Sequence, residues 1–170
     1  METVYLGLVV FLFVLSIFDL IVGVSNDAVN FLQSAIGAKV ATFRTIIIVA
    51  AVGIFVGASM SNGMMEIARN GIYHPSMFSF REIMFILLAV MASDIVLLDI
   101  FNSLGLPTST TVSMVFELLG GTVAIALMKT SGDPDLAIGD LMNTSKALTV
   151  IMAIFVSVAI AFFFGTLIQY

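Results

Sequence analysis

Apolar residues fill long runs of this chain, and short polar segments separate the runs. Five runs approach the roughly 20 residues that a helix needs to cross the hydrocarbon core of a bilayer. They are Val4 to Val24, Thr45 to Met60, Ile83 to Phe101, Val112 to Met128 and Ala147 to Ile168. No alternating pattern of about ten residues marks the strands of a membrane barrel. The pattern predicts an all-α membrane protein built as a bundle of transmembrane helices.

Polar residues interrupt the first apolar run without ending it. Ser25, Asn26, Asp27 and Asn30 lie within a run that continues to Ile36. A carboxylate at the centre of a spanning helix costs about 2.5 to 3.5 kcal/mol, so such groups persist where they line a pathway or bind a ligand. We expect a broken first helix, with two half-helices in series.

The polar residues of this segment carry oxygen atoms that suit a hard cation. If the helix resumes after the break, Asn26 and Asn30 share a face at i, i+4 spacing, and Asp27 neighbours Asn30 at i, i+3. Carboxylate and amide oxygens are ligands for hard cations. The segment therefore predicts a cation site at Asp27, Asn26 and Asn30, with Na⁺ at Asp27 and Asn30.

A hydroxyl-rich turn separates the third and fourth apolar runs. Gly105, Leu106 and Pro107 precede four consecutive hydroxyl residues, which are Thr108, Ser109, Thr110 and Thr111. Proline suits the first turn of a helix, whose free N–H groups carry partial positive charge and can bind an anion. Alternatively, Thr108 and Ser109 merely cap the helix. For this turn alone, both interpretations stay open.

The two polar segments together are typical of a transporter. Transporters build midplane sites from discontinuous helices, in which half-helix N-termini face anions while carboxylates and freed carbonyls hold the coupling cation. The break near Asp27 and the turn after Pro107 supply both parts of that arrangement. We therefore expect an anion to bind at the hydroxyl-rich turn and the coupling cation to bind at the segment around Asp27.

Both segments resemble signatures of the inorganic phosphate transporter (PiT) family. Residues 23–31, GVSNDAVNF, are similar to its G-A-N-D-V-A-N-S-F signature, and residues 105–111, GLPTSTT, to its G-x-P-V-S-T-T-H signature. Residues 49–58 and Gly71-Ile72 resemble the sequence between the signatures, so the match spans most of the chain. The resemblance implies secondary transport of phosphate driven by Na⁺ or H⁺, in a fold of two inverted repeats.

The resemblance also implies an architecture for this chain. The hydroxyl-rich turn is the tip of a re-entrant helical hairpin, and Asn26, Asp27, Asn30 and the four hydroxyl residues line the substrate and cation sites. Residues 1–170 form a single transmembrane repeat, one half of an inverted-repeat transporter. Its partner is a second inverted repeat or another copy of the chain, and we favour a fragment of a longer protein.

Two positions depart from the family pattern. Ile54 stands where many members have Glu, and Val112 stands where many have His. Both departures remove titratable groups, which favours Na⁺ over a proton relay as the coupling ion. Glu117, farther along the helix that contains Val112, is placed to take over part of a charge role.

Three other acidic residues lie within the apolar runs. Asp19 precedes Asp27 by eight residues and is expected to face the bundle interior. Asp94 and Asp99 are five residues apart, roughly 140° around a helix, so they do not share one narrow face. Each acid is either neutral or satisfied by a neighbour, or it belongs to a cation site. Of these acids we assign Asp99, the nearest to the turn, to the cation site.

Composition excludes several function classes. The chain has six Lys and Arg residues, too few for a nucleic-acid surface, and no Cys for thiol chemistry or thiolate metal sites. The lone His74 makes no metal site. We therefore expect no enzyme and no cofactor beyond Na⁺ as coupling ion, with phosphate, lipid and Na⁺ or H⁺ as partners and no nucleic acid.

Alternative functions and the orientation complete the prediction. Sulfate or another tetrahedral oxyanion is the second choice of substrate, because helix N-termini recognise charge and shape. An intramembrane aspartyl protease needs a paired-acid context that Asp94 and Asp99 lack, and a structural subunit has little use for the polar segments. Lys39 and Arg44 place their loop in the cytoplasm by the positive-inside rule. We expect a multi-pass protein of the cell membrane with its N-terminus outside.

Overall fold

The computed structural model describes residues 2–66, 71–133 and 135–169. These residues form helices and short connections, with no strand and one isolated antiparallel bridge, between Tyr73 and Met142. The long helices are α1 (Glu2–Gly37), α2 (Phe43–Ser59), α4 (Phe80–Leu104), α5 (Thr110–Gly132) and α7 (Thr144–Gln169). The short elements are α3 (Asn62–Glu66), the 3₁₀ turn η2 (Pro75–Met77) and α6 (Ile138–Leu141). The predicted all-α class is confirmed.

Four helices in the described ranges are long and apolar enough to cross a membrane. They are α1, α4, α5 and α7. The fifth predicted span falls on α2, an apolar helix of 17 residues, which corresponds to about 26 Å of helix. All five predicted apolar runs therefore coincide with helices, except that Met60 follows the end of α2, and the chain is an all-α membrane protein.

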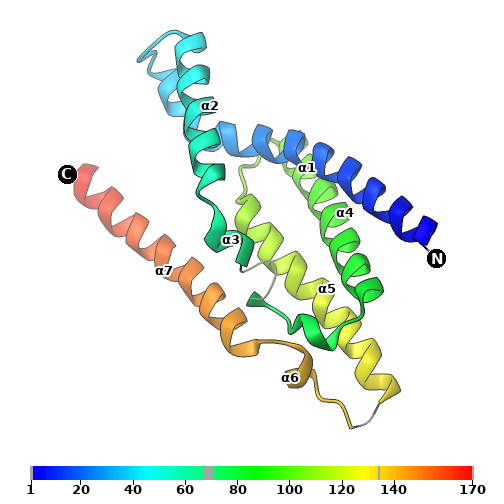
Figure 1. Cartoon of the computed structure of the whole chain (residues 1–170). Coiled ribbons are helices and arrows are strands. Elements are labelled where there is room, and N and C mark those ends of the chain that lie inside the picture. Colours follow the sequence, from blue (N-terminus) through cyan, green and yellow to red (C-terminus); the bar gives the residue numbers. More distant parts are fainter. Residues whose placement is uncertain (1, 67–70, 134, 170) are drawn as a thin grey trace.

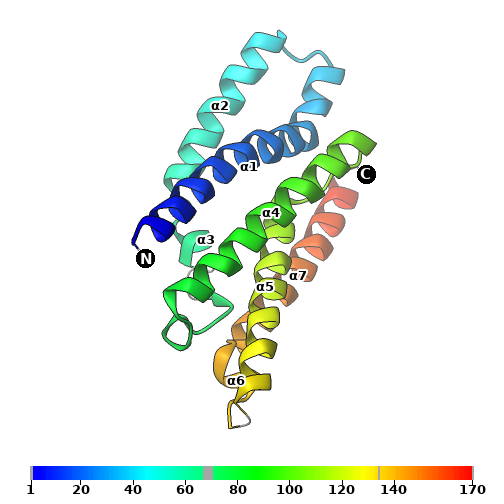
Figure 2. The same ribbon diagram turned by 90° about the vertical axis from the view of Figure 1, so that its right-hand side faces the viewer.

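The predicted break in the first helix is wrong. α1 is helical throughout Glu2–Gly37, although it changes direction near its C-terminal end (Figure 2). The polar segment contains no proline, and its Gly23 costs only about 1 kcal/mol in helix propensity. The Ser25 hydroxyl donates to the Ile21 carbonyl at 2.7 Å, so it bonds within its own helix. Polar side chains bend this helix locally at most, because the backbone N–H groups remain bonded.

Local sequence signals set the ends of the α4–α5 hairpin. Ser79 and Glu82 form a capping box at the start of α4, in which the Glu82 carboxylate accepts from the Ser79 N–H at 2.6 Å. Gly105 ends α4 with φ 67°, a left-handed conformation that favours glycine. The Ser109 hydroxyl accepts from the Val112 N–H at 3.4 Å and begins α5. The arms have 25 and 23 residues, each long enough to cross the bilayer, so re-entry of the hairpin stays a prediction.

The buried core lies mainly between α4 and α5, toward the end away from the hairpin tip. Residues 72–78 and the end of α6 cover it. Gly121 lets the two helices approach, because a Cβ at this position would lie 3.4 Å from the Ile86 Cγ2 atom. Lys129 pairs with Glu82 at 3.2 Å and also donates to the Met77 carbonyl at 2.8 Å. These contacts hold the two helices of the hairpin together at the end away from its tip.

The helices that position the polar segments form one packed unit. α1 packs mainly on α4, α4 packs on α5, and α1 also contacts α2 and α5. α7 lies outside this unit (Figure 1), and most of its side chains are exposed. The three-helix unit of α1, α4 and α5 therefore holds the candidate site.

Candidate functional site

Two asparagines of α1 bind the hairpin tip. Asn26 is 3% exposed; its Nδ2 donates to the Asn102 Oδ1 at 2.8 Å, and its Oδ1 accepts from the Thr108 N–H at 3.2 Å. Asn30 Nδ2 donates to the Thr108 carbonyl at 2.9 Å. The i, i+4 spacing thus places both amides on the face that meets the tip. Together the two amides bond both backbone polar groups of Thr108, its N–H and its carbonyl.

Asn102 belongs to this network, although the sequence analysis did not identify it. Its Nδ2 donates to the Val22 carbonyl at 3.2 Å, in addition to its bond with Asn26. The signal in the sequence is an amide three residues before Gly105, at the end of an apolar run. Together Asn26 and Asn102 join α1 to α4 beside the turn.

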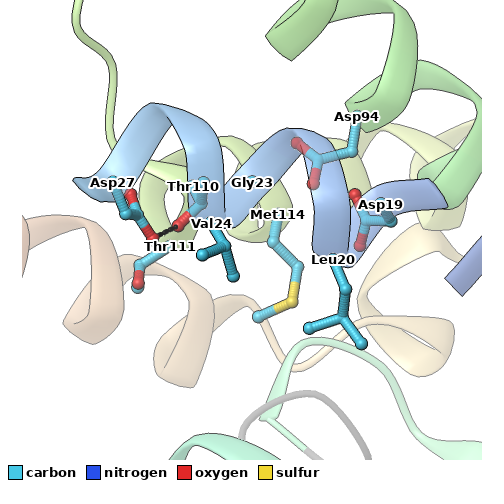
Figure 3. Close-up of a pocket in the computed structure, with 9 residues that line it drawn as sticks. All are labelled: Asp19, Leu20, Gly23, Val24, Asp27, Asp94, Thr110, Thr111 and Met114. Atoms are coloured by element: carbon cyan, nitrogen blue, oxygen red, sulfur yellow. Dashed lines mark hydrogen bonds between the residues drawn. The ribbon is translucent and has the colours of Figure 1, made fainter. Parts of the chain in front are cut away.

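Asp27 meets the beginning of α5. The Thr110 hydroxyl donates to the Asp27 Oδ2 at 3.0 Å (Figure 3). Both residues line an open cavity of about 230 Å³, which has room for several water molecules. The cavity is lined by Asp19, Leu20, Gly23, Val24, Asp27, Asp94, Thr110, Thr111 and Met114.

The N-terminus of α5 lies at the cavity. Thr110 and Thr111 are the first two residues of α5, and the first N–H groups of a helix have no partners within the helix. The helix dipole adds partial positive charge at this end. Ser109 caps the helix, so the capping interpretation is confirmed for that residue. Thr110 and Thr111 line the cavity, and anion binding by these two residues stays a prediction.

The structure divides the predicted site residues into groups. Asp27, Thr110 and Thr111 line the cavity; Asn26, Asn30 and Thr108 bind the tip to α1, and Ser109 caps α5. Asn26 also lines a smaller hollow of about 80 Å³ beside the turn.

The structure does not bring Asp99 to the cavity. Asp99 is exposed on α4, whereas Asp94, 6% exposed, lines the cavity together with Asp19. The two positions lie roughly 140° apart around the helix, so a rotation that points Asp94 toward α1 turns Asp99 away. The expected inward position of Asp19 is therefore found, and the α4 acid in the cavity is Asp94.

Gly23 is the point where α1 passes over the start of α5. A Cβ at this position would lie 3.6 Å from the Thr110 Cγ2 and 3.7 Å from the Leu98 Cδ1, which is ordinary contact. We expect Gly23→Ala to be tolerated. Gly23→Leu is expected to destabilise the protein by about 1 to 3 kcal/mol, because the extra atoms overpack the contact. Thermal unfolding in detergent measures both changes.

Gly120→Leu is the matched control for this prediction. Gly120 lies on α5, and a Cβ there would meet no atom within 4 Å. The control is therefore expected to unfold close to the wild-type temperature. Equal destabilisation by Gly23→Leu and Gly120→Leu would show that the α1–α5 approach is not close at Gly23.

Comparison with known proteins adds to this geometry. The sequence model of the phosphate transporter family matches residues 23–170. Two curated relatives, one from Mycobacterium bovis and one from Mycobacterium tuberculosis, are each named "Putative phosphate permease". Each is 30% identical over 110 residues, which cover 63% of this chain and 20% of the relative. No solved structure matches the chain.

The family match covers all residues of the candidate site except Asp19 and Leu20, which precede Gly23. It starts at the first residue of the polar segment of α1 and continues through the hairpin tip to the end of α7. The matched residues make up well over half of the chain. The resemblance of the two polar segments to family signatures is thereby confirmed, and the chain belongs to the phosphate transporter family.

Proposed function

We propose that this chain is a transmembrane repeat of a secondary active transporter that carries inorganic phosphate across the membrane together with Na⁺. The family and the names of the relatives support the substrate class. The observation that carries the proposal is the contact between Asp27 and Thr110, in which an intramembrane acid meets a helix N-terminus inside one cavity. The arrangement offers a carboxylate for a cation and N–H and hydroxyl donors for an anion.

Charge makes cation binding a requirement for anion binding in this cavity. Asp19, Asp27 and Asp94 all line it. Two like charges about 4 Å apart repel by about 4 kcal/mol at an effective dielectric constant of about 20. A phosphate anion is therefore disfavoured until positive charge enters. Because linkage is reciprocal, the cation and phosphate each raise the affinity of the other by the same factor.

The hydrogen bonds leave oxygen atoms for a cation. Asp27 Oδ2 accepts a hydrogen bond from Thr110, and Asn30 Nδ2 donates one to Thr108. We therefore assign the two remaining oxygens, Asp27 Oδ1 and Asn30 Oδ1, to Na⁺. Phosphate is assigned to the N–H groups and hydroxyls of Thr110 and Thr111. No residue has a catalytic role in this proposal.

The proposal includes a second repeat in the opposite orientation. The described ranges leave most of α7 and much of α1 exposed, with apolar side chains outward. A second inverted repeat, or another copy of the chain, and lipid cover these faces. The loop that contains Lys39 and Arg44 lies in the cytoplasm, which places the N-terminus outside the cell.

Uptake of labelled phosphate into liposomes that contain the protein tests this function. We expect uptake to require an inward Na⁺ gradient and to resist competition by excess sulfate. Uptake that sulfate suppresses as strongly as unlabelled phosphate would assign a general oxyanion carrier instead. Phosphate flux that is unchanged when K⁺ replaces Na⁺ would contradict Na⁺ coupling.

Ser109→Ala is expected to weaken phosphate binding more than cation binding. Ser109 caps α5, and loss of an N-cap costs about 0.5 to 2 kcal/mol, which loosens the donors of the first turn. The apparent affinities for phosphate and for Na⁺ are measured in the same liposomes. Equal losses of both affinities would point to a general folding defect and contradict the assigned role.

A further inference from the structure

Two acids line the end of the cavity away from Asp27, and a third lies close to them. The three acids are Asp19 on α1, Asp94 on α4 and Glu117 on α5. Figure 3 shows the carboxyl groups of Asp19 and Asp94 pointing toward each other, with Asp27 at the other end of the cavity. Asp19 and Asp27 are eight residues apart, about 12 Å along the helix. The two ends of the cavity are therefore separate positions.

This acidic cluster contains buried oxygens without partners. Asp94 is 6% exposed and lines the cavity. Within the described ranges, Asp94 Oδ1, Asp19 Oδ1 and Glu117 Oε2 are buried and accept no hydrogen bond. Burial of an ionised carboxylate is costly unless a partner compensates its charge. The oxygens therefore need a ligand that brings a donor or positive charge.

The charged groups around the cluster are acidic. Glu117 faces Asp19 and Asp94 from α5, and Asp27 lies farther along α1. α2, which also packs on α1, has Arg44 in its first turn as its single charged residue. Lys129 on α5 pairs with Glu82 at the end of the hairpin away from its tip. The neighbouring helices thus supply negative charge to the pair of Asp19 and Asp94.

The proximity of the two carboxyl groups favours a proton as the missing ligand. Asp19 and Asp94 are within hydrogen-bonding reach of each other, and two carboxyl groups form such a bond only when one of them carries a proton. A shared proton satisfies both aspartates with the atoms that are present.

We propose that Asp19 and Asp94 form a proton-binding site within the membrane. One carboxyl group takes a proton from the cavity and donates it in an O–H···O bond to the other, which remains ionised. The proton removes one negative charge from the cavity, so its binding favours the binding of phosphate near Thr110. This link to phosphate rests on the proposed function, whereas the proton site itself does not.

Infrared spectroscopy of the purified protein tests the site directly. We expect a protonated-carboxyl band at neutral pH that the double substitution Asp19→Asn with Asp94→Asn removes. Asp135→Asn, in the loop after α5, is the matched control and is expected to keep the band. The single substitution Asp94→Asn retains a donor for Asp19 and provides a second, conservative variant that also loses the band.

Three results would overturn the proton site. The band persists at full intensity in the double variant, or the wild-type protein shows no such band, or added Na⁺ shifts the carboxylate bands of wild type but not of the double variant. The last result would assign a cation site to the pair instead. A band that behaves as expected in a protein without phosphate uptake would retain the proton site and reject the transport function.

A transport measurement tests the link between the pair and phosphate. In liposomes, acidification of the outer medium is expected to stimulate phosphate uptake by the wild-type protein. The double variant is expected to lose this stimulation. Stimulation of the same size in both proteins would contradict the link.

Discussion

Asp27→Asn is expected to abolish Na⁺-dependent phosphate uptake while the protein stays folded in the membrane. The amide oxygen of the substituted side chain still accepts the hydrogen bond from the Thr110 hydroxyl, so the contact between α1 and α5 is retained. What is lost is the negative charge that holds the cation. Without the cation, the acids that remain in the cavity repel phosphate. The expected loss is at least about tenfold in transport at limiting Na⁺, about 1.4 kcal/mol or more.

Initial rates of labelled phosphate uptake, measured over a series of Na⁺ concentrations, check this prediction. Asp135→Asn makes the same chemical change in the exposed loop after α5 and is expected to transport like wild type. The melting temperature in detergent shows whether Asp27→Asn remains folded. Wild-type rates with unchanged Na⁺ dependence in Asp27→Asn would remove this residue from the mechanism.

Asn26→Ala is expected to produce the largest loss of stability among the site substitutions. Asn26 is nearly fully buried and bonds both Asn102 and Thr108. Truncation removes the hydrogen bonds to the Thr108 N–H and the Asn102 Oδ1, each worth about 0.5 to 1.5 kcal/mol. The hairpin tip then detaches from α1, so uptake falls together with stability.

Ser25→Ala is the matched control for Asn26→Ala. Ser25 is the adjacent residue, is exposed, and bonds the Ile21 carbonyl of its own helix. Its loss is expected to change the free energy of unfolding by no more than about 0.5 kcal/mol. Thermal unfolding of the two variants in the same detergent compares them. Equal melting temperatures would mean that Asn26 does not hold the tip on α1.

The positions of the helices and of the two polar segments could be predicted from the sequence. Long apolar runs define the helices because a bilayer sets their length, and a proline followed by hydroxyl residues marks the turn before α5. The sequence also predicts that the segment around Asp27 lies beside the turn around Thr110, because one offers ligands for a cation and the other offers donors for an anion. The structure places them in hydrogen-bond contact.

The rotation of the helices and the continuity of α1 could not be predicted. Polar residues such as Asn26 signal that a helix needs a polar partner, but they do not show whether the backbone breaks. The packing of α1 on α4 resolves this, because Asn102 and Thr108 satisfy its amide while the helix continues. The same packing decides that Asp94, and not Asp99, faces the cavity.

A density map of the protein with phosphate and Na⁺ bound tests the central claim most directly. That claim is that α1 and the tip of the α4–α5 hairpin together form one ion-binding chamber. We predict tetrahedral density against Thr110 and Thr111 at the start of α5, with cation density beside the Asp27 carboxylate. Phosphate bound elsewhere, with this cavity closed or occupied by lipid, would contradict the account.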